Sequence, residues 1–395
     1  QNSIAMPDRV VDSMSALEPR TPRELAEALG AAAGAGQTIA VGGHFTKQAM
    51  AGPLAPAATV ISAAGLRRVL AYEPRDLTVS VEAGLSYTEL QALLAHDRLM
   101  LPLDPPFSER ATMGGIAASG TCGPRRRFYG TPRDVVIGME FATLEGKLVQ
   151  SGGMVVKNVA GLDMGKLMIG SFGTLAVMVV VNFKLFPAPP CARTFVLRFA
   201  RLDEAIRARD GILKSALTPA AIDLVNPLAA VRLNEDGYLL ALQAGGNAAV
   251  IERYGRELPG AEAVEGAAEE RFWHAVREFT PQFLAANHEG AVVRVSATLV
   301  QVPAVMASLD VPAVARAGTG VCYGYFADVS SAQAWLRDKC LPVGWKAVIE
   351  FAPPERKRGL ELWPQPGPDL EVMRKIKRMF DPKNLLNPGR LYGRI

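Results

Sequence analysis

Apolar positions near the start of the chain repeat with the spacing of a helix that packs on a core. Leu25, Ala28, Leu29 and Ala32 stand at i, i+3, i+4 and i+7. They follow Thr21-Pro22-Arg23-Glu24, a capping box with proline at the first helical position. The pattern therefore predicts a helix that begins next to Thr21.

The next segments alternate between strand and helix patterns. Short apolar runs at Thr38–Val41 and Thr59–Ser62 predict buried strands, and the alternating run Arg75–Glu82 predicts a further strand. Ser86 and Glu89 form a second capping box before another helical stripe. This alternation indicates an α/β or α+β protein.

Glycine and proline are concentrated between Pro102 and Gly130. We expect a long loop there, and a loop of this length inside a compact domain is usually functional. Beyond it, Val135–Leu144 and Leu175–Leu185 predict strands, the second so continuously apolar that both faces of its sheet should be covered.

Phe186-Pro187-Ala188-Pro189-Pro190 marks the clearest boundary, and beyond it short strands and helices follow one another to about Phe351. This order predicts a smaller antiparallel α+β domain. The amphipathic run Asp369–Phe380 predicts a terminal helix that docks on the first domain. The expected organisation is a first domain over 6–187 with subdomains of about 6–73 and 74–187, a second domain over 191–351, and a returning segment over 360–395.

Composition narrows the function classes. Of 395 residues 49% are hydrophobic, and 43 basic against 39 acidic residues leave a net charge of +4. The apolar content excludes disorder, and the charge is too balanced for a chain specialised in binding nucleic acid. No apolar stretch is long enough to predict a transmembrane segment, and the first ten residues do not resemble a secretory signal. Four widely spaced cysteines favour a reducing, cytoplasmic compartment.

The first motif with chemical potential follows a predicted strand and reads Val41-Gly42-Gly43-His44-Phe45-Thr46-Lys47. Successive N–H groups in such a glycine turn can form a nest for a diphosphate. The spacing matches neither the nicotinamide Rossmann fingerprint nor a P-loop. A plain strand-to-loop turn is the alternative.

A second small-residue segment reads Thr112-Met113-Gly114-Gly115-Ile116-Ala117-Ala118-Ser119-Gly120. We expect it to offer free N–H groups along an elongated polar ligand; the alternative is a tight turn packed against a helix. Two such segments in one domain favour one long cofactor that touches both.

Arginines cluster next, in Arg125-Arg126-Arg127-Phe128-Tyr129. Guanidinium groups pair with carboxylates and phosphates in bidentate fashion, so the cluster predicts an anion site or a docking patch for a partner. A solvated basic loop is the alternative, and binding of nucleic acid is disfavoured.

Small residues also border the last apolar strand of the first domain, at Gly152-Gly153, 157–161 and 170–174. The four histidines His44, His96, His274 and His288 show no metal-ligand spacing, so no metal site is predicted. From the residues alone, the chain is expected to be a two-domain binder of a long, phosphate-bearing cofactor.

These segments together resemble the small FAD-binding subunit of glycolate oxidase, in the vanillyl-alcohol oxidase/p-cresol methylhydroxylase superfamily. The resemblance rests on GGHFTK, LTVSVEAGLSYTEL, LPLDPP, ATMGGIAASGTCGPRRRFYGTPRDVVIG, GGMVVKNVAGLDMGKLMIGSFGTLAVM and the ending FDPKNLLNPGRLYGRI. It is dense over about 66–187 and at the C-terminus, and poor over most of 191–351. It implies an α+β fold, with a bipartite FAD-binding domain and a smaller antiparallel α+β cap domain.

The resemblance also implies site residues. Residues 41–47 would hold the FAD diphosphate, and the segment 112–120 would line the cofactor down to the flavin. The implied cofactor-binding residues are Val41, Gly42, Gly43, His44, Phe45, Thr46, Lys47, Pro102, Thr112, Met113, Gly114, Gly115, Ala118, Ser119, Gly120, Asn158, Gly170, Gly173, Val177 and Asn387. Arg126 and Arg127 are the candidates for anchoring a substrate carboxylate or a partner, with Lys157 as a polar contact near the flavin.

The implied function is hydride transfer from a small 2-hydroxy acid to flavin, with electrons passing to an iron–sulfur subunit. A larger FAD-binding catalytic subunit would complete the complex, which could lie on the inner face of a membrane. His44 is a candidate covalent tether for FAD, as in some superfamily members. The chain lacks the histidine-rich metal motif of the larger subunit, so a non-catalytic or electron-relay flavin subunit is the main alternative. A stand-alone FAD-linked oxidase of another alcohol is a third.

Overall fold

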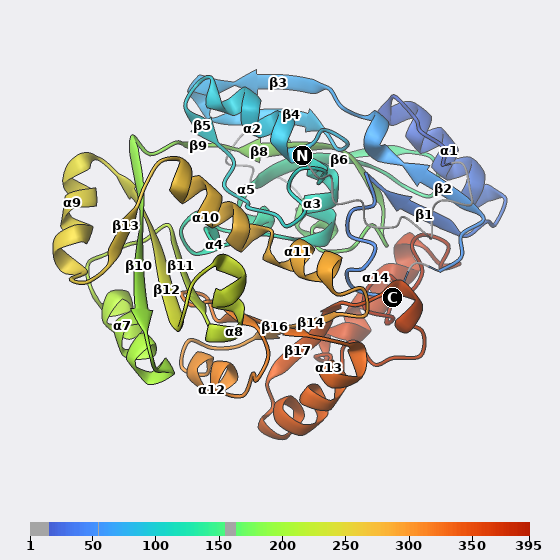
Figure 1. The fold of residues 1–395 in the computed structure, drawn as a ribbon. Coiled ribbons are helices and arrows are strands. Elements are labelled where there is room, and N and C mark those ends of the chain that lie inside the picture. Colours follow the sequence, from blue (N-terminus) through green and yellow to red (C-terminus); the bar gives the residue numbers. More distant parts are fainter. Residues whose placement is uncertain (1–15, 54, 155–162) are drawn as a thin grey trace.

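The computed structural model describes residues 16–53, 55–154 and 163–395. The chain begins with a small unit in which one helix covers two parallel strands (Figure 1). These are α1 (Pro22–Gly34), β1 (Ile39–Gly42) and β2 (Thr59–Ser62). As the sequence predicts, Thr21 caps α1 by accepting a hydrogen bond from the amide of Glu24, and Leu25 and Leu29 are fully buried.

A five-stranded antiparallel sheet follows, in the order β3-β4-β8-β6-β7. Strand β8 lies at its centre, and seven of its eight residues are buried, which explains the continuous apolar run. The strands are β3 (Val69–Glu73), β4 (Thr78–Glu82), β6 (Val136–Ala142), β7 (Leu148–Gly152) and β8 (Val177–Lys184). Around them lie α2 (Tyr87–Ala95), α6 (Met164–Met168) and the short pair β5 (Leu99–Met100) and β9 (Phe186–Pro187).

The expectation of one long loop over 102–130 is wrong, because part of it is helical. The helices are α3 (Met113–Ser119), α4 (Arg126–Tyr129) and, just beyond, α5 (Pro132–Val135). Thr112 caps α3, and a Cβ on Gly114 would lie only 2.7 Å from the Cβ of Ala83. Close packing against the end of β4 thus offsets the low helix propensity of glycine.

The second half of the chain forms an eight-stranded, wholly antiparallel sheet in the order β13-β10-β12-β11-β15-β16-β14-β17. The antiparallel pairing predicted for this region is therefore confirmed. Its strands are β10 (Cys191–Phe199), β11 (Ala221–Val225), β12 (Tyr238–Gly246), β13 (Glu262–Val264), β14 (Ala291–Ser296), β15 (Ala313–Arg316), β16 (Val321–Phe326) and β17 (Lys346–Phe351).

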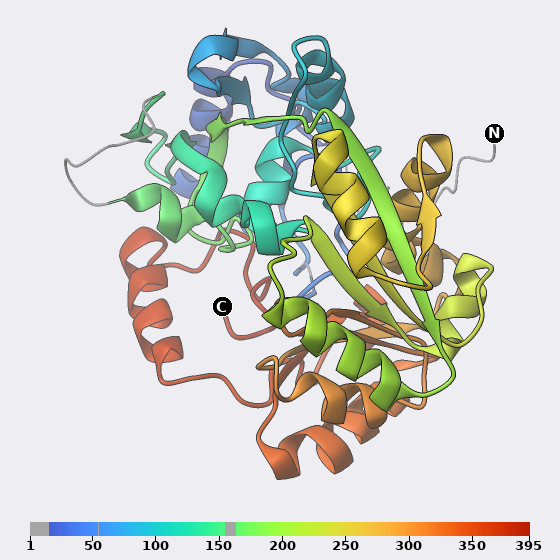
Figure 2. The same ribbon diagram turned by 90° about the vertical axis from the view of Figure 1, so that its left-hand side faces the viewer.

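Helices cover both sides of this sheet. In Figure 1, α7, α12 and α13 lie on the side turned away from the first domain, and α10 and α11 lie between the sheet and that domain. Figure 2, viewed from a second direction, also shows the two halves of the chain packed against each other. The helices are α7 (Leu202–Lys214), α8 (Pro227–Ala230), α9 (Ala248–Glu257), α10 (Ala267–Arg277), α11 (Phe279–Ala286), α12 (Val302–Ala307) and α13 (Val329–Trp335).

The C-terminal segment returns to the first domain after α14 (Asp369–Phe380). Leu386 forms a parallel bridge with Ile39 of β1, supported by hydrogen bonds of 2.8 and 2.9 Å between the two backbones. The buried Lys377 ammonium donates to Asp381 and to the carbonyls of Thr174 and Leu386, which holds the segment in place. The exact domain limits remain predictions.

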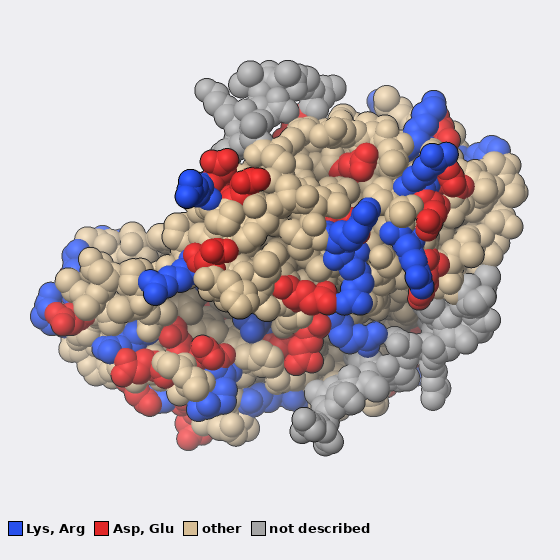
Figure 3. All heavy atoms as spheres, turned by 90° about the horizontal axis from the view of Figure 1, so that it is seen from above, with Lys and Arg blue, Asp and Glu red and all other residues tan. Residues whose placement is uncertain are grey.

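Charges on the surface are mixed in sign. On the face shown in Figure 3, Lys and Arg side chains lie among Asp and Glu. No helix in the described residues is both long enough and apolar enough to cross a bilayer.

Candidate functional site

The first glycine segment leaves a row of backbone donors free. Strand β1 ends at Gly42, and the chain then turns through Phe45, which has φ of 51°. Within the described residues, no group accepts a hydrogen bond from the amides of Gly43 to Lys47. Consecutive unpaired N–H groups form a concave anion site without needing many lysines, and this fits a diphosphate.

The first segment packs directly on the start of α3. A Cβ on Gly43 would lie 2.3 Å from Oγ1 of Thr112, so glycine is required for this approach. His44 Nδ1 is 2.9 Å from the carbonyl oxygen of Arg110, which ties the turn to the segment before α3. The covalent role suggested for His44 stays a prediction.

Helix α3 contributes a smooth face and not the row of free donors expected from its sequence. The amides of Met113 and Gly114 donate to the carbonyls of Leu85 and Ala83, and that of Gly115 donates to Thr112. Residues 115, 118 and 119 are only partly buried. Because Gly115 has no side chain and those of Ala118 and Ser119 are small, a flat ligand can lie against this part of the helix.

A third segment joins this surface at the C-terminal end of α3. The amides of Gly170 and Phe172 donate to the carbonyls of Ala117 and Ala118, at 3.1 and 2.8 Å. Gly120 faces Gly170, and a Cβ on Gly170 would meet nothing within 4 Å. The two glycines therefore border open space next to the smooth face of α3.

Asn387 links the segments from the C-terminal side. Its Oδ1 accepts from the Val41 amide at 2.9 Å, and its Nδ2 donates to the carbonyls of Val41, Phe172 and Gly173. The side chain is 3% exposed, so these bonds occupy it fully. Asn387 holds the site together and has no free group for a ligand.

Not every predicted cofactor residue reaches this surface. Val177 lies in the core beside α1, and Pro102, Met113 and Gly114 are also buried. Their low exposure leaves little surface for a ligand, so their roles are better explained by packing. Lys157 and Asn158 lie outside the described residues.

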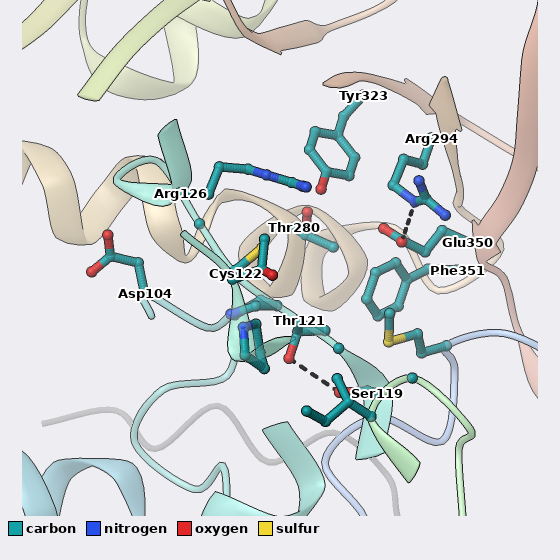
Figure 4. A pocket seen from close by; sticks show the side chains of 18 of the residues that line it. Asp104, Ser119, Thr121, Cys122, Arg126, Thr280, Arg294, Tyr323, Glu350 and Phe351 are labelled. Atoms are coloured by element: carbon teal, nitrogen blue, oxygen red, sulfur yellow. Dashed lines mark hydrogen bonds and ion pairs between the residues drawn. The ribbon is translucent and has the colours of Figure 1, made fainter. Parts of the chain in front are cut away.

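A cavity of about 380 Å³ continues from Gly120 and Gly170 toward the eight-stranded sheet. One wall comes from the first domain and the other from β14, β15, β16 and β17 (Figure 4). Its described lining includes five arginines and two carboxylates, which are Arg126, Arg133, Arg277, Arg294, Arg316, Asp104 and Glu350.

Most of these charges are already paired. Asp104 is held by Arg125 at 2.6 Å, Glu350 pairs with Arg294 at 2.7 Å, and Arg316 pairs with Asp223. Arg133 donates to the carbonyl of Lys166.

Arg126 and Arg127 differ in whether their guanidinium groups have a partner. Arg127 donates to the carbonyl of Gly318 at 2.9 Å and so links α4 to the loop after β15. The guanidinium of Arg126 makes no hydrogen bond or ion pair with a described residue, and in Figure 4 it points toward the hydroxyl of Tyr323. Of the two predicted anchors, only Arg126 lines the cavity.

The cavity also holds two weakly acidic groups that stay protonated at neutral pH. Burial raises the pKa of the Tyr323 hydroxyl, and the nearby Glu350 carboxylate raises it further. Burial likewise raises the pKa of the Cys122 thiol.

Sequence reasoning missed the residues contributed by the second domain. Arg294 and Arg316 are each the single charge of their strands, and Glu350 is the single buried charge of β17, whose other charged residue, Lys346, is exposed. A lone charge in a buried strand usually needs a partner or a cavity, and that signal could have identified them.

Comparison with known proteins agrees with this geometry. Residues 15–152 match the family described as FAD binding domain, and residues 365–391 match that described as FAD linked oxidases, C-terminal domain. The free amides after β1 and the open glycine surface fit such a cofactor. The molecule is thus an FAD-dependent oxidoreductase.

Individual relatives are similar to this chain over most of its length. The chain is 29% identical to glycolate oxidase subunit GlcE of Escherichia coli over 83% of this chain and 86% of that protein. It is 23% identical to glycolate oxidase subunit GlcD of Bacillus subtilis over 83% and 78%, and 24% identical to a mitochondrial D-lactate dehydrogenase of Arabidopsis thaliana over 82% and 64%. The chain is therefore similar to FAD-linked oxidoreductases of the glycolate oxidase and D-lactate dehydrogenase type.

The fold is shared with more distant proteins. A solved structure of alkyldihydroxyacetonephosphate synthase superposes with a TM-score of 0.70 at 16% identity, covering 94% of this chain and 75% of that one. The predicted α+β class with an FAD domain and an antiparallel-sheet domain is confirmed.

Proposed function

We propose that this chain is the FAD-binding subunit of a glycolate-type oxidoreductase complex and oxidises a small 2-hydroxy acid. The similarity to glycolate oxidase subunits supports this assignment. Bound FAD supplies the two-electron acceptor for the hydride that leaves the hydroxyl-bearing carbon. The electrons then pass to an iron–sulfur subunit, and a larger FAD-binding subunit completes the complex.

The unpaired Arg126 in a cavity next to the proposed flavin surface is the observation that carries the proposal. A guanidinium that is free of partners can hold a carboxylate through two parallel hydrogen bonds. Arg294 and Arg316 are held by acidic side chains, and Arg133 donates to a backbone carbonyl. Arg277 lies 3.8 Å from Asp104, which is a weaker contact. Arg126 is therefore the natural anchor for the substrate carboxylate.

Anaerobic flavin reduction tests this role. We expect glycolate or D-lactate to bleach the flavin of the purified chain. In Arg126→Met the substrate concentration for half-maximal rate should rise about 10- to 100-fold, because a charge-assisted hydrogen-bonded pair is worth about 1.5–3 kcal/mol. Arg256→Met, on the exposed side of α9, serves as the control. Equal behaviour of the two variants contradicts the anchoring role.

A second candidate is an electron-relay subunit that does not itself oxidise substrate. It is favoured because Asp104 is a weak base: burial alone would raise the pKa of this cavity carboxyl, but the paired Arg125 brings it below its ordinary value. In that case 2-hydroxy acids leave the flavin of the isolated chain oxidised. A second flavin subunit that is already reduced, when added to the solution, passes electrons to the flavin of this chain.

We further propose a cytoplasmic location, with any membrane association provided by the partner subunits. All four cysteines are free thiols, as expected in a reducing compartment.

A further inference from the structure

Glu350 occupies an irregular position in the second sheet. Val292 of β14 pairs with Phe351 and Val293 with Ile349, so Glu350 has no partner residue on that strand. Such a bulge re-aims a side chain, and bulges are frequent next to active sites. Here the side chain is directed into the cavity, although only 6% of the residue is exposed.

The surroundings fix the Glu350 carboxylate at the joint between the two domains. Arg294 Nε donates to its Oε1 at 2.7 Å, and the carbonyl of Glu350 accepts from the Ala51 amide, also at 2.7 Å. Ala51 lies shortly after the turn with the free amides, so the bulge is tied to the proposed diphosphate segment. Oε2 accepts no hydrogen bond from a described residue and is not fully buried, which leaves it open to the cavity.

Other groups that line the cavity are poorly suited to accept a proton. Both carboxylate oxygens of Asp104 accept hydrogen bonds from Arg125, at 2.6 and 2.8 Å. The Tyr323 hydroxyl and the Cys122 thiol remain protonated because burial raises their pKa values. The described lining contains no histidine.

We propose, on the basis of the proposed function, that Glu350 Oε2 accepts the hydroxyl proton of the 2-hydroxy acid. Arg126 and Glu350 reach the cavity from α4 and β17, on opposite sides in Figure 4, and can hold the two ends of one small substrate. The O–H bond breaks and its proton moves to Glu350. The C–H bond breaks and its electron pair leaves as hydride to FAD. A carbon–oxygen double bond forms, and the product is a 2-oxo acid.

Oxalate binding gives a test that does not depend on turnover. The second carboxylate of oxalate takes the place of the substrate hydroxyl and repels the Glu350 carboxylate, whose Oε2 has no hydrogen-bond donor among the described residues, whereas both oxygens of Asp104 are held by Arg125. Calorimetry in two buffers of different ionisation enthalpy should therefore show uptake of about one proton per oxalate at neutral pH. Glu350→Gln should bind oxalate without proton uptake. Wild-type binding without proton uptake overturns the proposal.

Flavin reduction provides the second arm. Glu350→Gln should slow reduction by 2-hydroxy acid about 10²- to 10⁴-fold, the usual contribution of a general base. Glu289→Gln is the matched control, because Glu289 also pairs with an arginine but lies on the surface. In Glu350→Ala, added formate should restore part of the rate, whereas a purely structural loss would not respond. A normal rate in Glu350→Gln, or no rescue by formate, contradicts the role of Glu350.

Flavin reduction distinguishes a failure of this proposal from a failure of the proposed function. If the wild-type flavin is not reduced by any 2-hydroxy acid, the proposed function fails. If it is reduced at equal rates in wild type and Glu350→Gln, only the role of Glu350 fails.

Discussion

At the scale of single residues, Lys47 shows how the proposed diphosphate segment lowers the stability of the cofactor-free protein. It ends the run of free amides and is only 9% exposed, and the charge of Glu278 favours its protonated form. Burial lowers its pKa to about 8, and Glu278 offsets this only in part. A buried cation beside unpaired N–H groups is destabilising unless an anion such as a diphosphate binds there.

Lys47 therefore predicts a pH dependence of the cofactor-free protein. Between pH 8 and 10.5 the unfolded chain keeps a proton that the folded chain has released, so the free energy of unfolding should rise with pH, by at most about 3 kcal/mol. Urea unfolding at several pH values should show this rise in wild type, and Lys47→Met should lack it. Added FAD should reduce it, because the diphosphate favours the charged lysine. Identical slopes in the two proteins contradict the prediction.

At the scale of elements, the C-terminal segment completes the site although it lies far away in the sequence. The Asn387 amide connects the end of β1 with the loop before β8. Its φ of 44° suits asparagine, which tolerates left-handed backbone better than most residues. The order of this segment and the shape of the cofactor surface are thus coupled.

Replacing Asn387 should uncouple the C-terminal segment from the proposed cofactor surface. Asn387→Ala leaves the Val41 amide and three carbonyls without their partner, and we expect a loss of about 2–4 kcal/mol in stability together with weaker FAD binding. Asn287→Ala removes a side chain with a single backbone bond in the second domain and is the control. Denaturant unfolding and fluorescence titration with FAD measure the two effects. Normal FAD affinity in Asn387→Ala contradicts the coupling.

At the scale of the whole molecule, polar contacts hold the two large sheets around the cavity. Glu278, between α10 and α11, accepts hydrogen bonds from the amides of Phe107 and Ser108 and from the Ser108 hydroxyl at 2.6–3.0 Å. Lys357, buried near the C-terminal segment, donates to the carbonyls of Ala49 and Ala51. Because both contacts lie near the turn that contains Lys47, docking of the domains also shapes the proposed cofactor site.

Glu278→Ala should weaken that docking. It leaves buried N–H groups unpaired and removes the charge that favours protonated Lys47, so we expect a loss of about 3 kcal/mol. Calorimetric unfolding should separate into two transitions, one of them sensitive to FAD. Glu269→Ala, which breaks a buried polar contact within the second domain, is the control and should keep one transition. A single transition at the wild-type temperature in Glu278→Ala contradicts the prediction.

Local patterns were sufficient where local physics decides the structure. Helix α1 forms where the cap at Thr21 and its apolar stripe predict it. Strand β8 forms where the continuous apolar run predicts it. The glycine segments also indicated a long, phosphate-bearing cofactor, and the resemblance that they carry indicated FAD. Helix α3 was missed because glycine-rich sequences have low helix propensity, and only packing against Ala83 makes this one helical.

The sequence by itself determined the mixed fold class, the positions of the glycine segments and the arginine cluster, because these depend on spacing along the chain. Only the tertiary structure decided that Arg126 is left unpaired while Arg127 is occupied, and that Glu350 faces the same cavity. Those properties depend on which charges from distant strands reach each guanidinium, and no local pattern encodes such distances.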